Sequence, residues 1–263
     1  MKRIDLNCDM GELPEAVADG SQEELMRFIS SANIACGGHA GDAEMMRATI
    51  EQALRCGVAV GAHPGYEDRA NFGRVELQLS PAEIADSVQR QILALEEAAS
   101  KLGARIAHVK AHGALYNQAT RERDIARAIA EGVRRWRTRV LMVGLAGSPM
   151  LEEFSAAGFA VAAEAFADRR YERDGSLRSR KFADALLKDP TEAAEQALQI
   201  AEHGRVAAAD GSVLSLRADT ICIHGDTPGA LAIAREVHRR LQSVGIEPAR
   251  LHSTKPRDAN CLS

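Results

Sequence analysis

Side chains that can transfer protons or bind metals stand in short groups along this chain, each after a short apolar run. Asp9 lies in Asn-Cys-Asp-Met-Gly-Glu, His39 follows a Gly-Gly pair, and Lys110 begins Lys-Ala-His-Gly. Carboxylates and imidazoles suit general acid–base catalysis and also bind divalent metals. An inward-facing ammonium group costs free energy unless it meets an anion, so Lys110 indicates contact with a carboxylate or phosphate. The candidate catalytic residues are Asp9, His39, His63 and Lys110.

Polar residues near these positions are candidates for substrate binding. Asp5, Asn7 and Asp9 alternate along one run, so a strand would present all three side chains on one face. Neighbouring arginines suit bidentate recognition of a carboxylate or phosphate. The substrate-binding candidates are Asn7, Glu12, His112, Asn117, Glu164, Arg169, Arg170, His224 and Asp226, and the candidate metal ligands are Asp9, His39, His63 and His112.

Each candidate also has a structural interpretation. Asp9 fits a buried carboxylate that holds neighbouring loops, and His63 fits a histidine of the core. Asp226 fits the cap of a following helix as well as it fits a ligand contact. From the residue types alone, the carboxylates could therefore bind a metal, act as a base or anchor a substrate amine.

The chemistry-bearing groups must be positioned by a regular alternation of elements. Short apolar runs alternate with segments of helical periodicity, which predicts a parallel sheet with helices between its strands. The carboxyl ends of such strands open onto one rim, where the polar groups would converge. The predicted strands are Arg3–Cys8, Ala32–Ala35, Val58–Ala62, Ile106–Lys110, Val140–Gly144, Ala160–Glu164 and Thr220–His224, and the predicted helices are Asp42–Arg55, Pro81–Leu102, Arg121–Trp136, Ser148–Ala156, Thr191–Glu202 and Pro228–Val244.

Three segments interrupt this alternation. Residues 65–79 and 168–190 are too long for ordinary connections, and loops of that length are usually functional or disordered. Residues 206–216 carry Asp-Gly between short apolar runs, which predicts a small β-hairpin insertion. Residues 252–263 have no periodicity, so we expect a loosely ordered tail after a single domain at 1–251.

The composition excludes several classes of protein. A chain of 263 residues suits one barrel domain, and no apolar run approaches the ~20 residues that a membrane span needs. The start lacks the pattern of a signal peptide, so we expect a cytoplasmic protein. The net charge of -4 provides no general attraction to nucleic acid, and five cysteines without a C-x-x-C pair argue against a disulfide framework. A phosphate loop, a dinucleotide fingerprint and a nucleophile elbow are all absent from the sequence.

Several of these motifs, in their order along the chain, closely resemble those of the LamB/YcsF family. The resemblance covers roughly residues 1–251, and Ala111 departs from it where a proline is expected. This departure leaves Lys110 and His112 in place. The motifs that carry the resemblance are Asp5-Leu-Asn-Cys-Asp-Met-Gly-Glu12, Asn33-Ile-Ala-Cys-Gly-Gly-His-Ala-Gly-Asp42, Gly61-Ala-His-Pro-Gly-Tyr66, Val109-Lys-Ala-His-Gly-Ala-Leu-Tyr-Asn117, Glu164-Ala-Phe-Ala-Asp-Arg-Arg-Tyr171 and Ile223-His-Gly-Asp226.

The resemblance implies a fold and an activity. The implied fold is an α/β protein with a seven-stranded, TIM-like β/α barrel, similar to the glycoside hydrolase and polysaccharide deacetylase type. The implied reaction is the ATP-dependent hydrolytic opening of 5-oxoproline (pyroglutamate) to L-glutamate, with release of ADP and phosphate. The implied enzyme is a multi-subunit 5-oxoprolinase with partner subunits B and C. Its implied cofactor is ATP, together with either Mg²⁺ or a transition metal bound at the site.

Given that reaction, the rim residues take provisional roles. Lys110, with Arg169 or Arg170, would stabilise developing negative charge, while Asp9, His39 or His63 would position water or act as a base. Two other functions fit the same residues. One is a deacetylase or amidohydrolase that depends on a divalent metal and acts alone. The other is a non-catalytic subunit that binds a lactam or a carbohydrate. We expect neither nucleic acid nor a membrane among the partners.

Overall fold

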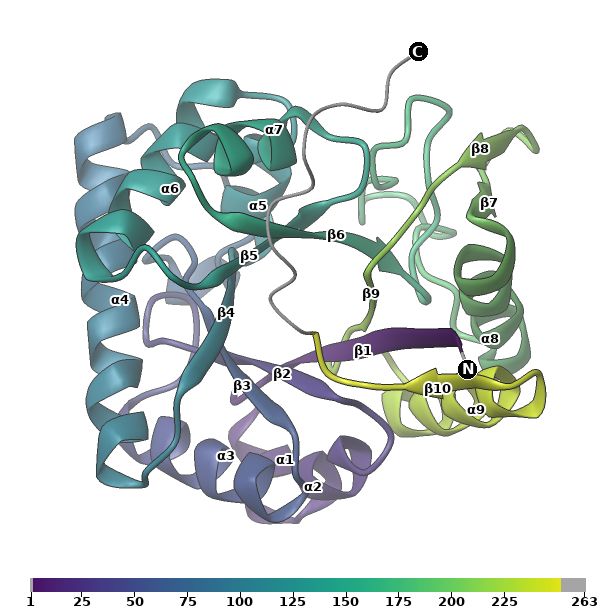
Figure 1. Cartoon of the computed structure of the whole chain (residues 1–263), viewed down its shortest axis with the longest axis horizontal. Helices are drawn as coiled ribbons and strands as arrows, with labels where there is room; N and C mark the ends of the chain where they lie inside the picture. Colours follow the sequence, from purple (N-terminus) through teal and green to yellow (C-terminus); the bar gives the residue numbers. More distant parts are fainter. Residues whose placement is uncertain (1, 252–263) are drawn as a thin grey trace.

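Seven parallel strands close into a barrel in the computed structural model, which describes residues 2–251 (Figure 1). Each strand pairs with the next around the ring, and the last of them pairs again with the first. The predicted fold class, a seven-stranded β/α barrel, is therefore confirmed. The barrel strands are β1 (Lys2–Met10), β2 (Ser31–Ala35), β3 (Ala59–His63), β4 (Ile106–Lys110), β5 (Leu141–Leu145), β6 (Ala160–Phe166) and β9 (Thr220–Ile223).

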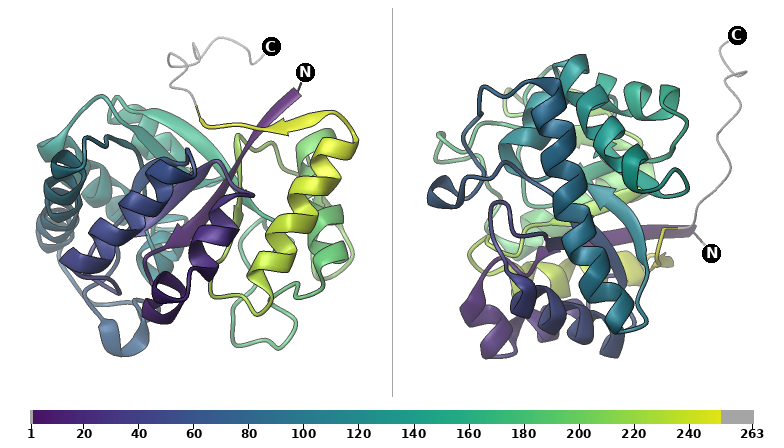
Figure 2. Two further views of the ribbon diagram at one scale, coloured as in Figure 1. Left: turned by 90° about the horizontal axis from the view of Figure 1, so that it is seen from below. Right: turned by 90° about the vertical axis from the view of Figure 1, so that its left-hand side faces the viewer.

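Helices surround the barrel, with α4 on one side and α8 and α9 on the opposite side (Figures 1 and 2). Among the described residues, each helix is too short or too polar to cross a membrane. The helices are α1 (Pro14–Ala18), α2 (Ser21–Met26), α3 (Ala43–Arg55), α4 (Pro81–Lys101), α5 (Gly113–Ala119), α6 (Arg123–Trp136), α7 (Pro149–Ala156), α8 (Pro190–Leu198) and α9 (Ala230–Ser243), with a 3₁₀ turn η1 (Arg69–Asn71) and a π-helical turn η2 (Gln199–His203).

Local capping chemistry explains where the long helices begin. Ser80 and Glu83 form a reciprocal capping box at the start of α4, with Pro81 at the first helical position. Asp42 caps α3 by accepting a hydrogen bond from the backbone of Met45. These starts were predicted. The short helices α1, α2 and α5 were not, because fewer than eight residues provide too little periodicity.

Two small additions complete the fold. The predicted hairpin is confirmed as β7 (Arg205–Ala207) paired antiparallel with β8 (Val213–Ser215). A further strand, β10 (Ile246–Pro248), pairs with the amino end of β1 and was not predicted, since three residues carry no pattern. The predicted tail at 252–263 lies outside the described residues.

Polar side chains fill the barrel interior, where bulky branched apolar residues are common in barrels of this kind. Asp5 accepts hydrogen bonds from Ser31 at 2.6 Å and from Thr220, and Asn7 donates to Glu164 at 3.0 Å. These contacts confirm that the alternating residues of β1 share the inward face. The apolar core lies instead between the strands and the helices, and its fully buried members include Leu6, Ile34, Val109, Ile129, Ile221 and Leu241.

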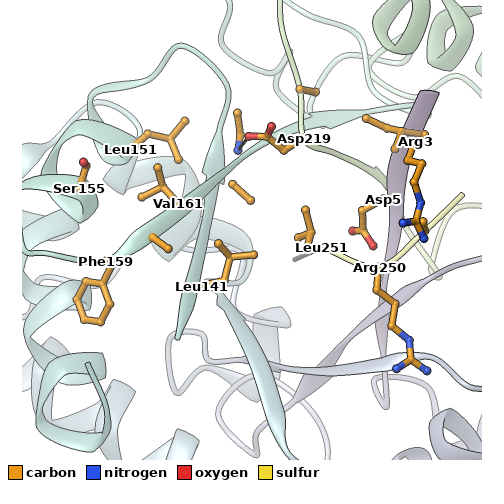
Figure 3. Close-up of a pocket in the computed structure, with 16 residues that line it drawn as sticks. Arg3, Asp5, Leu141, Leu151, Ser155, Phe159, Val161, Asp219, Arg250 and Leu251 are labelled. Carbon is orange, nitrogen blue, oxygen red and sulfur yellow. Dashed lines mark hydrogen bonds between the residues drawn. The ribbon is translucent and has the colours of Figure 1, made fainter. Parts of the chain in front are cut away.

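A cavity of about 460 Å³ opens at the amino ends of the strands (Figure 3). Arg3 and Asp5 line it from β1, and Leu141 and Val161 line it from β5 and β6. Burial raises the pKa of Asp5, and its oxygens accept hydrogen bonds from neighbouring hydroxyl groups. Asp5 therefore belongs to the end of the barrel opposite the rim where the predicted site residues converge.

Close packing inside the barrel demands glycine at position 61. A Cβ atom at Gly61 would lie 2.0 Å from Nε2 of His108, whose ring contacts the side chain of Asn33 at 2.7 Å. We expect Gly61→Ala to lower the free energy of unfolding by about 1–3 kcal/mol, as overpacking does, measured by urea denaturation. In the double variant Gly61→Ala/His108→Ala, the loss should be smaller than the sum of the two single losses. Additive losses would contradict the clash.

Candidate active site

A cavity of about 790 Å³ opens at the carboxyl ends of the barrel strands. Its walls come from the ends of β1, β3, β4, β6 and β9, from α5 and from the loop at 168–190. The convergence expected from parallel strands is therefore present. The predicted site residues that line this cavity are Asp9, Glu12, His63, Lys110, His112, Asn117, Arg169, His224 and Asp226.

Four predicted residues lie away from the cavity wall. Asn7 and Glu164 are buried beneath it and hydrogen-bonded to each other, and His39 is buried behind Glu12. The backbone of Arg170 pairs with the loop at 178–185, and its side chain is not among those lining the cavity. Asn7, Glu164 and His39 therefore hold the residues of the cavity wall in position. Arg170 lies outside the site.

Lys110 places a buried ammonium group at the cavity floor. Its ammonium group lies 3.0 Å from Oδ1 of Asp9, 2.8 Å from Oε1 of Glu164 and 3.1 Å from Sγ of Cys222. Burial lowers the pKa of Lys110, but the negative charge of Asp9 and the groups around it outweigh burial and raise that pKa well above its usual value. The predicted contact between this lysine and an anion is made by carboxylates of the protein itself.

Asp9 is held ionised by its surroundings. Its Oδ1 accepts from Nδ2 of Asn33 at 2.8 Å and from Lys110, and its Oδ2 lies 3.4 Å from Nε2 of His63. Burial raises the pKa of Asp9, yet His63 and Lys110 outweigh it and hold the pKa well below its ordinary value. Sequence reasoning did not assign Asn33 a role at the site, although an amide inside an apolar strand was an available signal.

Three histidines and one carboxyl group form a second cluster, contributed by the last residue of β3 and by residues that follow β1, β2 and β4. Oε1 of Glu12 lies 2.9 Å from Nε2 of His39, 3.2 Å from Nδ1 of His112 and 3.9 Å from Nε2 of His63. Burial lowers the pKa of His39 to about 4, so this ring is neutral at pH 7. One ligand atom from each of these four residues lies within 4.8 Å of the others, so the group can hold a metal ion. In this group Glu12 stands where the prediction had Asp9, and Asp9 belongs instead to a second group that could hold a metal ion, with Cys222 and His224.

The long loop after β3 explains how these histidines are held. Phe72 has a left-handed backbone (φ 55°), which is uncommon for a residue other than glycine, and its carbonyl accepts from Nε2 of His112 at 2.9 Å. The next residue, Gly73, packs so closely that a Cβ atom there would lie 2.7 Å from Cβ of His39. The loop at 65–79 therefore builds the site, in agreement with the expectation of a functional loop.

Charged groups also cross-link the rim of the cavity. Asp226 accepts hydrogen bonds from Arg74 and, at 3.0 Å, from Arg180 in the second long loop. Helix α9 begins after Gly229, so the interpretation of Asp226 as a helix cap is wrong. Nη2 of Arg169 donates to the carbonyl of Arg178 at 2.7 Å, while its Nε has no hydrogen-bond partner among the described residues.

His224 is oriented by groups on both sides. Asp168 accepts from Nδ1 of His224 at 2.9 Å and from the hydroxyl group of Thr227 at 2.6 Å. The imidazole stacks on the ring of Phe166, with centroids 5.3 Å apart. Sequence reasoning missed Phe166 and Arg180 as cavity residues, because an aromatic residue at a strand end and an arginine in an irregular loop carry no distinctive pattern.

The ion pairs of Asp226 predict a pH-dependent contribution to stability. Burial raises the pKa of Asp226, but the charge of Arg180 outweighs burial and the pKa is lowered. A carboxyl group with a lowered folded-state pKa stabilises the fold above its unfolded pKa and loses that contribution as the pH falls through the folded value. We expect Asp226→Asn to cost about 1.5 kcal/mol at pH 7 and progressively less below about pH 4. Urea denaturation at a series of pH values measures this, and a difference that stays constant down to pH 3 would contradict it.

Comparison with known proteins places the chain in a family. Residues 4–256 match the model of the LamB/YcsF family. A relative from Chloroflexus aggregans, named as the A subunit of 5-oxoprolinase, is 50% identical over 94% of this chain and 98% of its own length. A second relative of that name, from Heliobacterium modesticaldum, is 45% identical over 93% of this chain and 96% of its own.

One solved structure agrees with this assignment, and a second shares the fold. The lactam utilization protein from Thermus thermophilus superimposes with a TM-score of 0.88 at 42% identity, over 95% of this chain and 100% of that one. A family 4 carbohydrate esterase from Streptomyces lividans has a TM-score of 0.52 at 11% identity, over 97% and 98% of the two chains, and shares only the fold. The chain described here belongs to the LamB/YcsF family.

Proposed function

We propose that this chain catalyses the hydrolytic opening of the 5-oxoproline ring to L-glutamate, in a reaction coupled to hydrolysis of ATP to ADP and phosphate. The relatives' names supply the substrate, and their designation as one lettered subunit of 5-oxoprolinase supports a multi-subunit enzyme with partner subunits B and C. We further propose that the catalytic domain spans residues 1–251 and that the enzyme is cytoplasmic.

The observation that carries the proposal is the buried Lys110 and Asp9 pair at the floor of the cavity, with His63 beside it. Hydrolysis of a lactam places negative charge on the carbonyl oxygen and needs a base to accept a proton from water. Lys110 supplies a fixed positive charge. Asp9 is ionised and can accept a proton, although its lowered pKa makes it a weaker base than an ordinary carboxylate. Both groups are buried, where electrostatic stabilisation is stronger than in water.

The reaction assigns a task to each part of the cavity. The carboxylate of 5-oxoproline binds to Arg169 at the rim, whose buried Nε has no partner among the described residues. The lactam carbonyl oxygen then faces Lys110. Asp9 accepts a proton as water adds to the carbonyl carbon, the bond from that carbon to nitrogen breaks, and the nitrogen takes this proton from Asp9 to become the amine of glutamate. Asn117 and His224 orient the substrate from either wall.

ATP makes chemical sense in this reaction because a lactam carbonyl is a poor electrophile. Phosphorylation of its oxygen by ATP, with release of ADP, would activate the carbon toward water. Cleavage of the carbon–nitrogen bond would then leave an acyl phosphate, and a second water would release phosphate and glutamate. We assign ATP and Mg²⁺ to the assembled enzyme as its cofactors. Lys110 would then face the negatively charged oxygens of the phosphoryl group, which ammonium side chains bind well, while Arg169 keeps the substrate carboxylate.

The proposal is tested by measuring glutamate and ADP release from 5-oxoproline and ATP, with this chain mixed with its partner subunits and each component omitted in turn. Glutamate release that requires this chain and ATP is the expected result. With folded partners present, an absence of coupled turnover would overturn it.

The Glu12 and histidine cluster favours a second candidate, a hydrolase that depends on a divalent metal and acts alone. That candidate predicts hydrolysis by the isolated chain that requires metal and ignores ATP. A third outcome, in which cavity variants change the affinity for 5-oxoproline but leave turnover intact, would assign the chain a binding role only.

A further inference from the structure

The hydrogen bonds of His63 and His112 fix which ring nitrogen carries the proton in each residue. Nδ1 of His63 lies 2.8 Å from the backbone carbonyl of Lys110, and Nε2 of His112 lies 2.9 Å from the carbonyl of Phe72. A carbonyl oxygen only accepts hydrogen bonds, so both of these nitrogens must donate. In the neutral rings the remaining nitrogens, Nε2 of His63 and Nδ1 of His112, therefore carry lone pairs.

These two lone pairs face each other across a short gap. Nδ1 of His112 lies 3.0 Å from Nε2 of His63, and Oε1 of Glu12 lies 3.2 Å and 3.9 Å from those two atoms. Burial lowers the pKa of His63, but Asp9 outweighs burial and raises it, so a metal that binds here displaces the proton of that ring. With both rings neutral, the form in which imidazole binds a metal, three acceptor atoms converge. Ligands bound at ~2.0–2.1 Å around a tetrahedral ion lie about 3.3 Å apart, a separation that the observed distances bracket.

His39 does not fit the same coordination sphere. Its ring lies parallel to that of His112, with an interplanar angle of 2° and centroids 3.6 Å apart. The lone pairs of stacked parallel rings run side by side, so one ion cannot lie in both ring planes. Instead, Nε2 of His39 donates to Oε1 of Glu12 at 2.9 Å, and His39 does not line the cavity. We therefore treat His39 as a residue that positions the carboxylate.

We propose that Glu12, His63 and His112 bind one divalent transition-metal cation, with an open coordination position facing the cavity. Two imidazole nitrogens and one carboxylate oxygen form a ligand set that Zn²⁺ accepts, and all three residues line the cavity. The two backbone carbonyls are the outer hydrogen-bond partners that usually orient ligating histidines.

The local charge balance supports the same conclusion. Two buried carboxyl groups, those of Asp9 and Glu164, share the single ammonium group of Lys110, and the third, that of Glu12, has only histidines as ion-pair partners among the described residues. A divalent cation would offset the excess negative charge, which is expensive to bury without a partner. When bound, such an ion supplies a Lewis acid that polarises a carbonyl group or a water molecule. The inference rests on the geometry of the ligands and holds independently of the proposed reaction.

The test is titration of the chelator-treated, full-length chain with Zn²⁺ by isothermal calorimetry. We expect one Zn²⁺ per chain, loss of binding in His63→Ala and in Glu12→Gln, and a roughly 10–100-fold weaker affinity in His39→Ala, which removes only an outer contact. His203→Ala, which changes an exposed histidine on η2, is the matched control and should bind as the parent chain does.

A readout that needs no variant guards against failures of folding. Co²⁺ added to the parent chain should produce the visible absorption bands of a tetrahedral site, and Zn²⁺ should abolish them in a one-to-one titration. A folded parent chain that binds neither ion in stoichiometric amounts would overturn the inference, as would binding that survives in folded His63→Ala. If ring opening proceeds in the assembled enzyme while the chain binds no metal, only this inference fails; metal binding without turnover counts against the proposed function alone.

Discussion

Lys110→Met should reduce glutamate release by the assembled enzyme about 10²–10³-fold, the usual cost of removing one electrostatic contact to a developing oxyanion. The ammonium group of Lys110 is buried at the cavity floor between Asp9 and Glu164, and no other lysine among residues 2–251 is buried there. The loss should appear mainly in kcat, because the charge on the oxygen grows as the transition state forms. Initial rates over a range of 5-oxoproline concentrations measure it.

Loss of the lysine should also destabilise the fold, so the control must separate the two effects. Removing one partner of a buried ion pair typically costs about 3–5 kcal/mol, since the remaining charge is left unpaired. The double variant Lys110→Met/Glu164→Gln removes one charge of each sign and should recover part of that stability without recovering activity. Lys101→Met, at an exposed position on α4, should change neither the stability nor the activity. Turnover near the parent rate in folded Lys110→Met would exclude the assigned role.

Asp9→Asn should lower the rate about 10²–10⁴-fold, the range that general acid–base catalysis contributes. The amide keeps the shape of the side chain and can still accept from Asn33, while the carboxylate that takes the proton from water is gone. We therefore expect enzyme that is less stable, because Lys110 keeps only Glu164 as a carboxylate partner, but that still folds and assembles, with a severe loss of glutamate release measured in parallel with circular dichroism.

A matched control lies on the same strand. Asp5 shares the inward face of β1 with Asp9, but it lines the cavity at the amino ends of the strands and bonds to Ser31 and Thr220. Asp5→Asn should lower the free energy of unfolding and leave the rate per folded enzyme unchanged. The account would be contradicted if Asp9→Asn lost only stability, or if Asp5→Asn lost the activity instead.

Much of the fold could be predicted from the sequence because its signals are local. The strand at 106–110 and the capping box at Ser80 and Glu83 were both placed correctly, since alternation and capping depend on near neighbours. The single helix predicted at 191–202 is divided in the structure into α8 and the π-helical turn η2, a division that periodicity could not predict because it does not distinguish the two helix types. Strand β10 was missed because three residues are too few to show a strand pattern, and only their pairing with β1 identifies them as a strand.

The sequence predicted which residues come together at the site, but not the contacts that set their roles. Parallel strands brought Asp9, His63 and Lys110 to one rim, as expected from topology. The sequence could not show that Lys110 is paired with Glu164, a residue far along the chain, or that Asn33 completes the environment of Asp9. Those contacts depend on the radius and register of the closed barrel, which three-dimensional structure alone reveals.

The most direct measurement is a structure of the assembled enzyme with 5-oxoproline and ATP, using Asp9→Asn to slow turnover. The account predicts the lactam in the 790 Å³ cavity, with its carbonyl oxygen within hydrogen-bonding distance of Nζ of Lys110 and its carboxylate on Arg169. A lactam bound only to the partner subunits, with this cavity holding solvent in every copy, would contradict the claim that this chain opens the ring.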